Sequence, residues 1–217
     1  MSTLTQQQRD AISAKLAGMH ITVGLGTEHE ACSVAAINLA LTGALTDKIP
    51  DCMSAVIGRW IITVQDAMPD AMRNSAQWRE LIPLAAGTGR GAEIERSGLI
   101  IDWMWSVVLP ALQPTADSGG FGAEWAGMCV LKTSTSASTA WAAASAASTS
   151  SAASIAWAAG WAAASAASTA SAASAAWAAS AASTASAAAW ATKAGLWEKF
   201  DPAGLLGRLI AVSENIK

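Results

Sequence analysis

Charge is the largest absence in this chain of 217 residues, because residues 133–192 contain no Asp, Glu, Lys, Arg or His. These 60 residues, here called the Ala/Ser/Trp tract, also lack Pro, Leu, Val and Phe, and more than a third of them are Ser or Thr. A membrane-spanning helix needs about 20 predominantly apolar residues, which this composition does not supply. We therefore expect the tract to be covered by protein rather than by lipid.

The chain also has no Tyr, little Phe, no excess of basic residues and no Cys pattern, and these features exclude several classes of protein. The chain has no Tyr and only two Phe, so its 11 Trp residues provide nearly all of the aromatic surface. The net charge of −3 gives no reason to expect nucleic acid, whose binding proteins carry clustered basic residues. The three Cys residues are odd in number and follow no pattern, and the polar N-terminus has no apolar signal core. We therefore expect reduced thiols and a cytoplasmic location.

The tract itself consists of 31 Ala, 22 Ser or Thr, five Trp, one Ile and one Gly. It is repetitive, since residues 141–160 realign on residues 161–180 and a shorter third copy follows at an offset of 15. Alanine is the strongest helix former, so the summed propensity predicts mainly α-helix. Within the repeats, Ser recurs every third residue, which does not match a helical turn of 3.6 residues, so the Ser residues spiral around the helix. Polyproline II is the alternative that this period allows.

The candidate interaction residues are the five indoles of the tract, Trp141, Trp157, Trp161, Trp177 and Trp190. At about 100° per residue, Trp141 and Trp177 share one helix face and the other three cluster on the opposite face. One neighbouring helix cannot cover both faces, so we expect the tract to fold back near Gly160 or to pack against a second copy. The plainer interpretation is a low-complexity expansion whose Trp residues are ordinary core.

Residues 1–115 are interpreted as a block of helices. Thr3 or Thr5 can cap a first helix that ends near Gly18, and the run HITVG that follows is interpreted as a loop. A second helix is expected over about residues 28–41, acidic in its first turn and stopped by Gly43.

The clearest apolar stripe of the block recurs at helical spacing from Met53 to Met68 and ends at Pro69. Ser75 is expected to cap the next helix. Residues 98–112 then suit a buried central helix with a kink at Pro110.

The remaining segments flank the tract. Residues 116–132 are expected to contain a linker and a helix that leads into the tract, since residues 113–122 combine Pro with three Gly. Residues 193–217 should form a C-terminal helix with Asp201 as N-cap and Pro202 in its first turn. Its Leu-rich face should dock on the N-terminal helices or on the end of the tract.

The densest group of potential metal ligands is Glu28, His29, Glu30 and Cys32, with His20 close in sequence. Only His29 and Cys32 are spaced by three residues, and no CxxC or HxxxH pair completes a site. We predict no metal and no cofactor, and interpret the group as the acidic first turn of a helix. Cys32 should be buried and unreactive.

Two further groups of residues could form sites. Asp66, Asp70 and Arg73 flank the corner at Pro69 and, with Arg59 and Asp102, could line a polar pocket, although solvated ion pairs are the simpler interpretation. The loop GTGRG at residues 87–91 lacks the GK[ST] of a phosphate-binding loop and is interpreted as a turn. No nucleophile, base and orienting group come together in the sequence, so we predict that the protein is not an enzyme.

The order of a helical block, an AAS/WAA tract and a Leu-rich closing helix resembles uncharacterised bacterial and phage proteins with similar tracts. That resemblance implies no known activity. The tract is also similar in composition to alanine-rich helical antifreeze proteins, which place Thr at a regular interval on one face. Here Thr139, Thr149, Thr169, Thr184 and Thr192 are spaced by 10, 20, 15 and 8 residues, so that regular row is missing.

The sequence thus predicts an all-α protein with four parts: a helical domain at 1–115, a linker and lead-in helix at 116–132, the tract at 133–192, and a C-terminal helix at 193–217. The predicted role is structural or interactive, with a homo-oligomer or another protein as partner. The alternative is binding of a ligand or surface, including ice, by an ordered Ser/Thr face of the tract.

Overall fold

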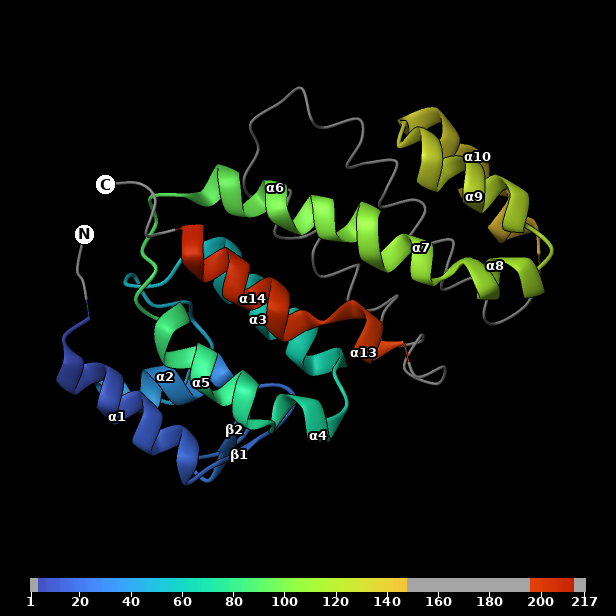
Figure 1. Ribbon diagram of the computed structural model, residues 1–217. Helices are drawn as coiled ribbons and strands as arrows, with labels where there is room; N and C mark the ends of the chain where they lie inside the picture. The colour runs from blue at the N-terminus through green and yellow to red at the C-terminus, as the bar shows by residue number, and fades with distance from the viewer. Residues whose placement is uncertain (1–3, 148–195, 213–217) are drawn as a thin grey trace. The chain divides into compact units, whose positions relative to one another are not determined.

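The computed structural model describes residues 4–147 and 196–212, and they form an all-α architecture with one very small sheet (Figure 1). The chain divides into two compact units. The first combines residues up to Leu99 with those from Asp201 onward, and the second is Ile100–Phe200. The expected domain boundary near residue 115 therefore falls inside the second unit.

The first unit begins with α1 (Gln6–Ala17), and the predicted N-cap is confirmed at Thr5. The Thr5 hydroxyl oxygen accepts a hydrogen bond from the backbone N–H of Gln8 at 3.2 Å, and the Gln8 side chain reaches back to the backbone N–H of Thr5. This reciprocal capping satisfies two donors that the first turn leaves without helical partners. Ile12 and Leu16 are the buried residues of α1, which packs against α2 and α5.

Two short strands replace the loop that the sequence predicted after α1. The strand β1 (His20–Ile21) pairs in parallel with β2 (Glu30–Ala31), so that His20 lies opposite Glu30. The side chain of Asn74 holds β1 from its other edge, accepting from the N–H of Ile21 at 2.9 Å and donating to its carbonyl at 3.0 Å. These partners are distant in sequence, which is why propensity alone missed the pairing.

The second helix, α2 (Ser33–Thr42), starts later than expected. Its N-cap is Cys32, whose sulfur accepts from the N–H of Ala35, and its C-cap is Gly43 with φ of 73°. The interpretation of Glu28–Glu30 as an acidic first turn was wrong, because Glu30 lies in β2 and the helix begins beyond it. The Gly43 terminator was predicted correctly.

Three helices follow: α3 (Ala55–Ala67), α4 (Asp70–Arg73) and α5 (Ala76–Ala85). The predicted stripe on α3 and its flanks is the core of the first unit, and its buried members are Met53, Val56, Ile57, Trp60, Ile61, Val64 and Met68. Ser75 caps α5, as predicted, by accepting from the N–H of Trp78 at 3.2 Å. The rings of Trp60 and Trp78 meet with centroids 6.1 Å apart.

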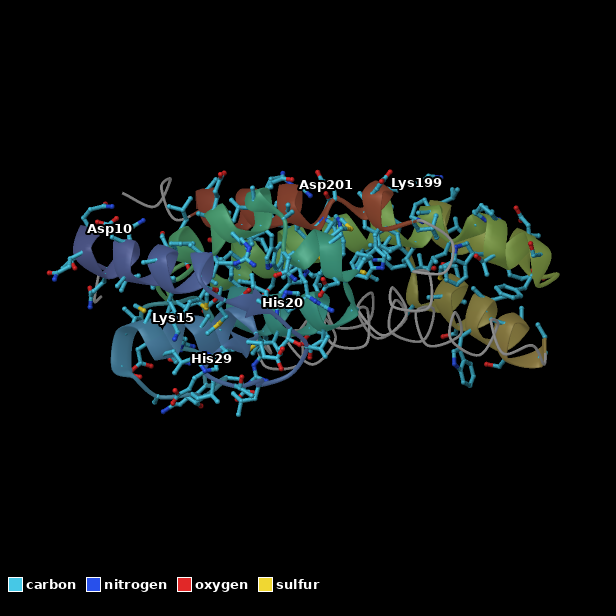
Figure 2. The ribbon with its side chains drawn as sticks, turned by 90° about the horizontal axis from the view of Figure 1, so that it is seen from below. Asp10, Lys15, His20, His29, Lys199 and Asp201 are labelled. Carbon is cyan, nitrogen blue, oxygen red and sulfur yellow. The ribbon has the colours of Figure 1, made fainter. Side chains whose placement is uncertain are left out.

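The first unit is completed by α14 (Pro202–Ala211), which lies against α3 and α5 (Figure 1). Leu205, Leu206 and Leu209 are buried, which confirms that this helix docks on the N-terminal helices. Its predicted N-cap is also confirmed, since an Asp201 carboxylate oxygen accepts from the N–H of Gly204 at 3.0 Å. Asp201 is labelled in Figure 2.

The predicted central helix is divided into α6 (Glu93–Trp103), a π-helical turn η1 (Met104–Val108) and α7 (Leu109–Ala111). Pro110 explains the irregularity, because it lacks an N–H and its ring crowds the carbonyl four residues earlier, on Ser106 inside η1. Trp105, Val108 and Leu109 are buried, so η1 and α7 contribute to the core of the second unit despite the irregular turn.

The second unit continues with α8 (Gln113–Ser118), α9 (Gly122–Leu131), α10 (Ser134–Ala146) and α13 (Trp197–Phe200). The lead-in helix is confirmed as α9. The stretch expected as a linker is instead occupied mostly by α8, whose Ala116 is buried. In α13, Phe200 meets Trp103 edge to face with centroids 6.4 Å apart, and Trp103 donates to the Phe200 carbonyl at 2.7 Å.

Candidate interaction surface

The beginning of the Ala/Ser/Trp tract is the helix α10, which packs along α9 (Figure 1). Thr133 caps it by accepting from the N–H of Ser136 at 3.2 Å. Ala137, Ala140 and Ala144 lie on one face and are buried. Such small residues let two helix backbones approach closely. This part of the tract is therefore a packed helix, as predicted from its Ala content.

The opposite face of α10 is exposed and carries no charge. Its outermost residues include Thr135, Ser138, Thr139 and Ala142, and Trp141 at its edge leaves 49% of its surface exposed. An indole buries a large apolar area when it contacts a partner. The exposed part of Trp141 could therefore stabilise a contact with another helix. Of the five predicted interaction residues, Trp141 lies within the described part of the chain. Trp157, Trp161, Trp177 and Trp190 lie outside the described residues.

The platform beneath α10 is built on Trp125 of α9. Its ring is fully buried, meets Phe121 edge to face with centroids 6.3 Å apart, and donates from Nε1 to the Leu109 carbonyl at 2.8 Å. Met128 is also fully buried. These contacts fix α9 against α7, so the surface that receives α10 is held in place by the core of the second unit.

Close packing of α10 on α9 is tested by changing Ala140 to Leu. Ala140 is fully buried, so added methylene groups must push the two helices apart, and we expect a loss of about 1–3 kcal/mol in the free energy of unfolding. The measurement is urea denaturation followed by circular dichroism. Ala142→Leu is the matched control, because Ala142 is exposed on the same helix and should change stability by under about 0.5 kcal/mol. Equal effects of the two substitutions would contradict this packing.

The predicted ligand group around Glu28 to Cys32 does not converge. His20 Nε2 lies 3.0 Å from Asp70 Oδ1 on α4. The sulfur of Cys32 instead accepts from the N–H of Ala35 at the start of α2. Burial raises the pKa of the Cys32 thiol, an effect larger than the opposing hydrogen bonds from Ala35 and Val34. A buried thiol with a raised pKa has little thiolate, in agreement with the predicted lack of reactivity.

The acidic and basic residues at the Pro69 corner bind backbone groups and each other. Arg73 contacts the Asp70 carboxylate at 3.2 Å and donates to the Met68 carbonyl at 3.0 Å. Asp66 accepts from the N–H of Gly24, which fixes the loop between the two strands. Asp102 instead accepts from the hydroxyl of Ser106, four residues along the chain.

The glycine-rich loop at residues 87–91 is a turn, as predicted. The Thr88 hydroxyl oxygen accepts from the N–H of Ser54 at 3.0 Å and donates to the Ala85 carbonyl at 2.7 Å. The N-terminus of α3 beside it is occupied by the carboxylate of Glu93, which accepts from the N–H of Ala55 at 2.8 Å. The favourable electrostatic position at this helix terminus is therefore filled by the protein's own anion.

Sequence reasoning missed two buried polar groups. Gln65 accepts from the N–H of Ser33 at 3.1 Å and donates to the Thr22 carbonyl at 3.0 Å, tying α3 to α2 and to the end of β1. Arg96 is also buried. A signal for Arg96 was present, since it lies four residues from both Ala92 and Ile100, which are buried.

Within the described ranges, no three His, Cys, Asp or Glu side chains gather closely enough to hold a metal ion. The absence of a metal and of a cofactor therefore remains a prediction. None of the helices in those ranges is both long and apolar enough to cross a membrane.

No family model, no curated protein and no solved structure matches this chain.

Proposed function

We propose that this chain is a non-enzymatic structural or interaction protein that associates with copies of itself through the Ala/Ser/Trp tract. The observation that supports this most directly is the packing of α10, which buries a ridge of three Ala residues and leaves the indole of Trp141 exposed. The same helix thus has one face that is already packed and one apolar group still available to a partner.

The residue pattern of α10 recurs later in the tract. Relative to Trp141, the buried Ala residues lie four positions before, one before and three after. The corresponding positions are Ala153, Ala156 and Gly160 around Trp157, and Ala173, Ala176 and Ser180 around Trp177. All six are small, so both stretches have a sequence suited to the close packing that α10 makes on α9.

The remaining two Trp residues of the tract depart from this pattern. Trp161 has another Trp four positions before it, and Trp190 is followed three positions later by Lys193. We therefore assign the small-residue packing to the stretches around Trp141, Trp157 and Trp177. The other two indoles contribute apolar area to the proposed contact.

The mass of the protein in solution tests this proposal. At low micromolar concentration we expect the wild type to have at least twice the chain mass of 22.0 kDa, measured by light scattering after size exclusion. At about 100° per residue, Trp157, Trp161 and Trp190 lie on one face of a helix. Changing all three to Ala removes the indoles of that face and should reduce the mass to that of one chain.

The matched control changes Ser151, Ser171 and Ser186 to Ala, which alters the same tract while keeping every indole. This variant should keep the mass of the wild type. A single-chain mass for both wild type and Trp variant, with equal helix content, would eliminate self-association through the tract.

A second function is supported by the outer face of α10, where Thr135, Ser138 and Thr139 are exposed together. Such a face could bind a ligand or an ice surface. The Thr139 hydroxyl already donates its hydrogen to the Thr135 carbonyl at 3.1 Å, so this hydroxyl has no hydrogen left to donate to a ligand or to ice. Thermal hysteresis in the wild type that is lost on changing Thr135 and Thr139 to Val would favour this function over self-association.

A further inference from the structure

The outward face of α9 is a second apolar surface, separate from the tract. Ala123, Ala126 and Val130 recur at helical spacing and are all exposed. Val130 leaves 79% of its surface exposed, and the adjoining Leu131 leaves 62%. The two large aliphatic side chains and the methyl groups of Ala123 and Ala126 together form an exposed apolar face. The other side of the same helix is buried in the core.

A glycine lies within this face. Gly127 is in the interior of α9, where glycine is less favourable than alanine, and a methyl group added there would meet nothing within 4 Å. Gly122 on the same helix differs, because a methyl group there would collide with the Asp117 carboxylate. No contact within the described residues requires Gly127 to be small. Together with Ala123, four residues earlier, it makes a place where another helix backbone can approach closely.

The charges around the face indicate what that helix is. Glu124 and Lys132 are the only charged residues in the segment 122–147, and they lie near opposite ends of α9. Both are exposed, and neither makes an ion pair within the described part of the chain. Two copies of α9 placed antiparallel bring the carboxylate of each toward the ammonium group of the other, whereas a parallel arrangement places like charges together.

We propose that the outward face of α9 is a self-association surface that binds the α9 helix of a second copy of this chain, antiparallel and about a two-fold axis. The arrangement is self-complementary, as a two-fold contact requires: apolar side chains and Gly127 lie at the centre and opposite charges at the two ends. The face is only about three helical turns long, so the area it can bury is well below the about 800 Å² per partner of a standard interface. The contact is therefore weak on its own. It does not depend on the tract, and each surface can fail separately.

Sedimentation velocity on the full chain tests the proposal in the Trp157, Trp161 and Trp190→Ala background, which removes the proposed tract contact. At concentrations of hundreds of micromolar we expect a monomer–dimer equilibrium. Glu124→Lys should weaken the dimer about tenfold by opposing like charges, and the exchange Glu124→Lys with Lys132→Glu should restore it. Gly127→Leu should also abolish the dimer, whereas Gly127→Ala, the smallest added group, should weaken it far less.

Three results would overturn the proposal. The first is a monomer at every concentration. The second is a dimer that Glu124→Lys does not weaken or that the charge exchange does not restore. The third is a full-length monomer whose α9 amides are protected from hydrogen exchange equally at low and high protein concentration, which would assign the face to a contact within the same chain. If the tract variant keeps the wild-type mass at low concentration, self-association through the tract fails while the charge exchange still tests α9.

Discussion

Replacing Arg96 with Met is expected to lower the free energy of unfolding of the first unit by about 3–5 kcal/mol. The guanidinium group is buried, and among the described residues it donates to the backbone carbonyl groups of Gly89 at 3.0 Å, Thr88 at 3.0 Å and Leu209 at 3.3 Å. Methionine fills most of the same volume but cannot donate a hydrogen bond to any of these carbonyl groups. The substitution therefore exposes the cost of unsatisfied acceptors rather than of a cavity.

The measurement is urea denaturation followed by Trp fluorescence, with Arg208→Met as the matched control. Arg208 is exposed on α14, so its replacement should change stability by under about 0.5 kcal/mol. Burial also lowers the pKa of Arg96, and nearby Glu93 and Glu95 partly oppose that shift. Arg96→Lys should not rescue stability, because a single ammonium group cannot reproduce the planar fork of donors that the guanidinium group directs at these carbonyl groups. A rescue by Lys, or a loss equal to that of the control, would contradict this account.

Replacing Trp125 with Ala is expected to lower the stability of the second unit by about 3–5 kcal/mol. This ring is fully buried, contacts Phe121 edge to face and donates to the Leu109 carbonyl at 2.8 Å, so its removal leaves both a cavity and an unsatisfied acceptor. Since α10 packs on the helix that Trp125 anchors, the variant should also lose helical signal from the start of the tract.

The control for Trp125 is Trp141→Ala, measured at low protein concentration so that association does not contribute. Trp141 is the same residue type on the neighbouring helix but is half exposed, and we expect its loss to cost under about 1 kcal/mol. Trp125→Phe keeps a ring and removes the donor, so an intermediate loss of about 1–2 kcal/mol is expected. If thermal denaturation ranked Trp141→Ala as the more damaging change, the assignment of Trp125 as the anchor would be wrong.

Features encoded by neighbouring residues were predictable from the sequence. The helix α3 could be predicted because its apolar side chains recur at helical spacing and Pro69 ends the pattern. The caps at Thr5, Ser75 and Asp201 could be predicted because each is a short polar side chain that reaches an N–H within its own helix. These interactions span three residues, so no knowledge of the fold is needed to find them.

Features that depend on distant partners were not predictable. The backbone at β1 is held by Asn74, 53 residues from Ile21, and the acidic run before Cys32 was misread because it pairs with that strand. Gln65 is buried because Ser33 and Thr22 surround it, a fact that no local period contains. At the candidate surface, composition predicted a helical start to the tract, but not which face of α10 is packed or that the outer side of α9 is exposed.

The first unit is assembled from two stretches of chain that are separated by Ile100–Phe200. During synthesis, its N-terminal helices must therefore wait for α14 to leave the ribosome before their shared core is complete. The entropic cost of closing such an excursion rises only with the logarithm of its length, so one extra 20-residue copy of the repeat adds about 0.2 kcal/mol. A change of one repeat copy therefore costs the first unit little in chain entropy.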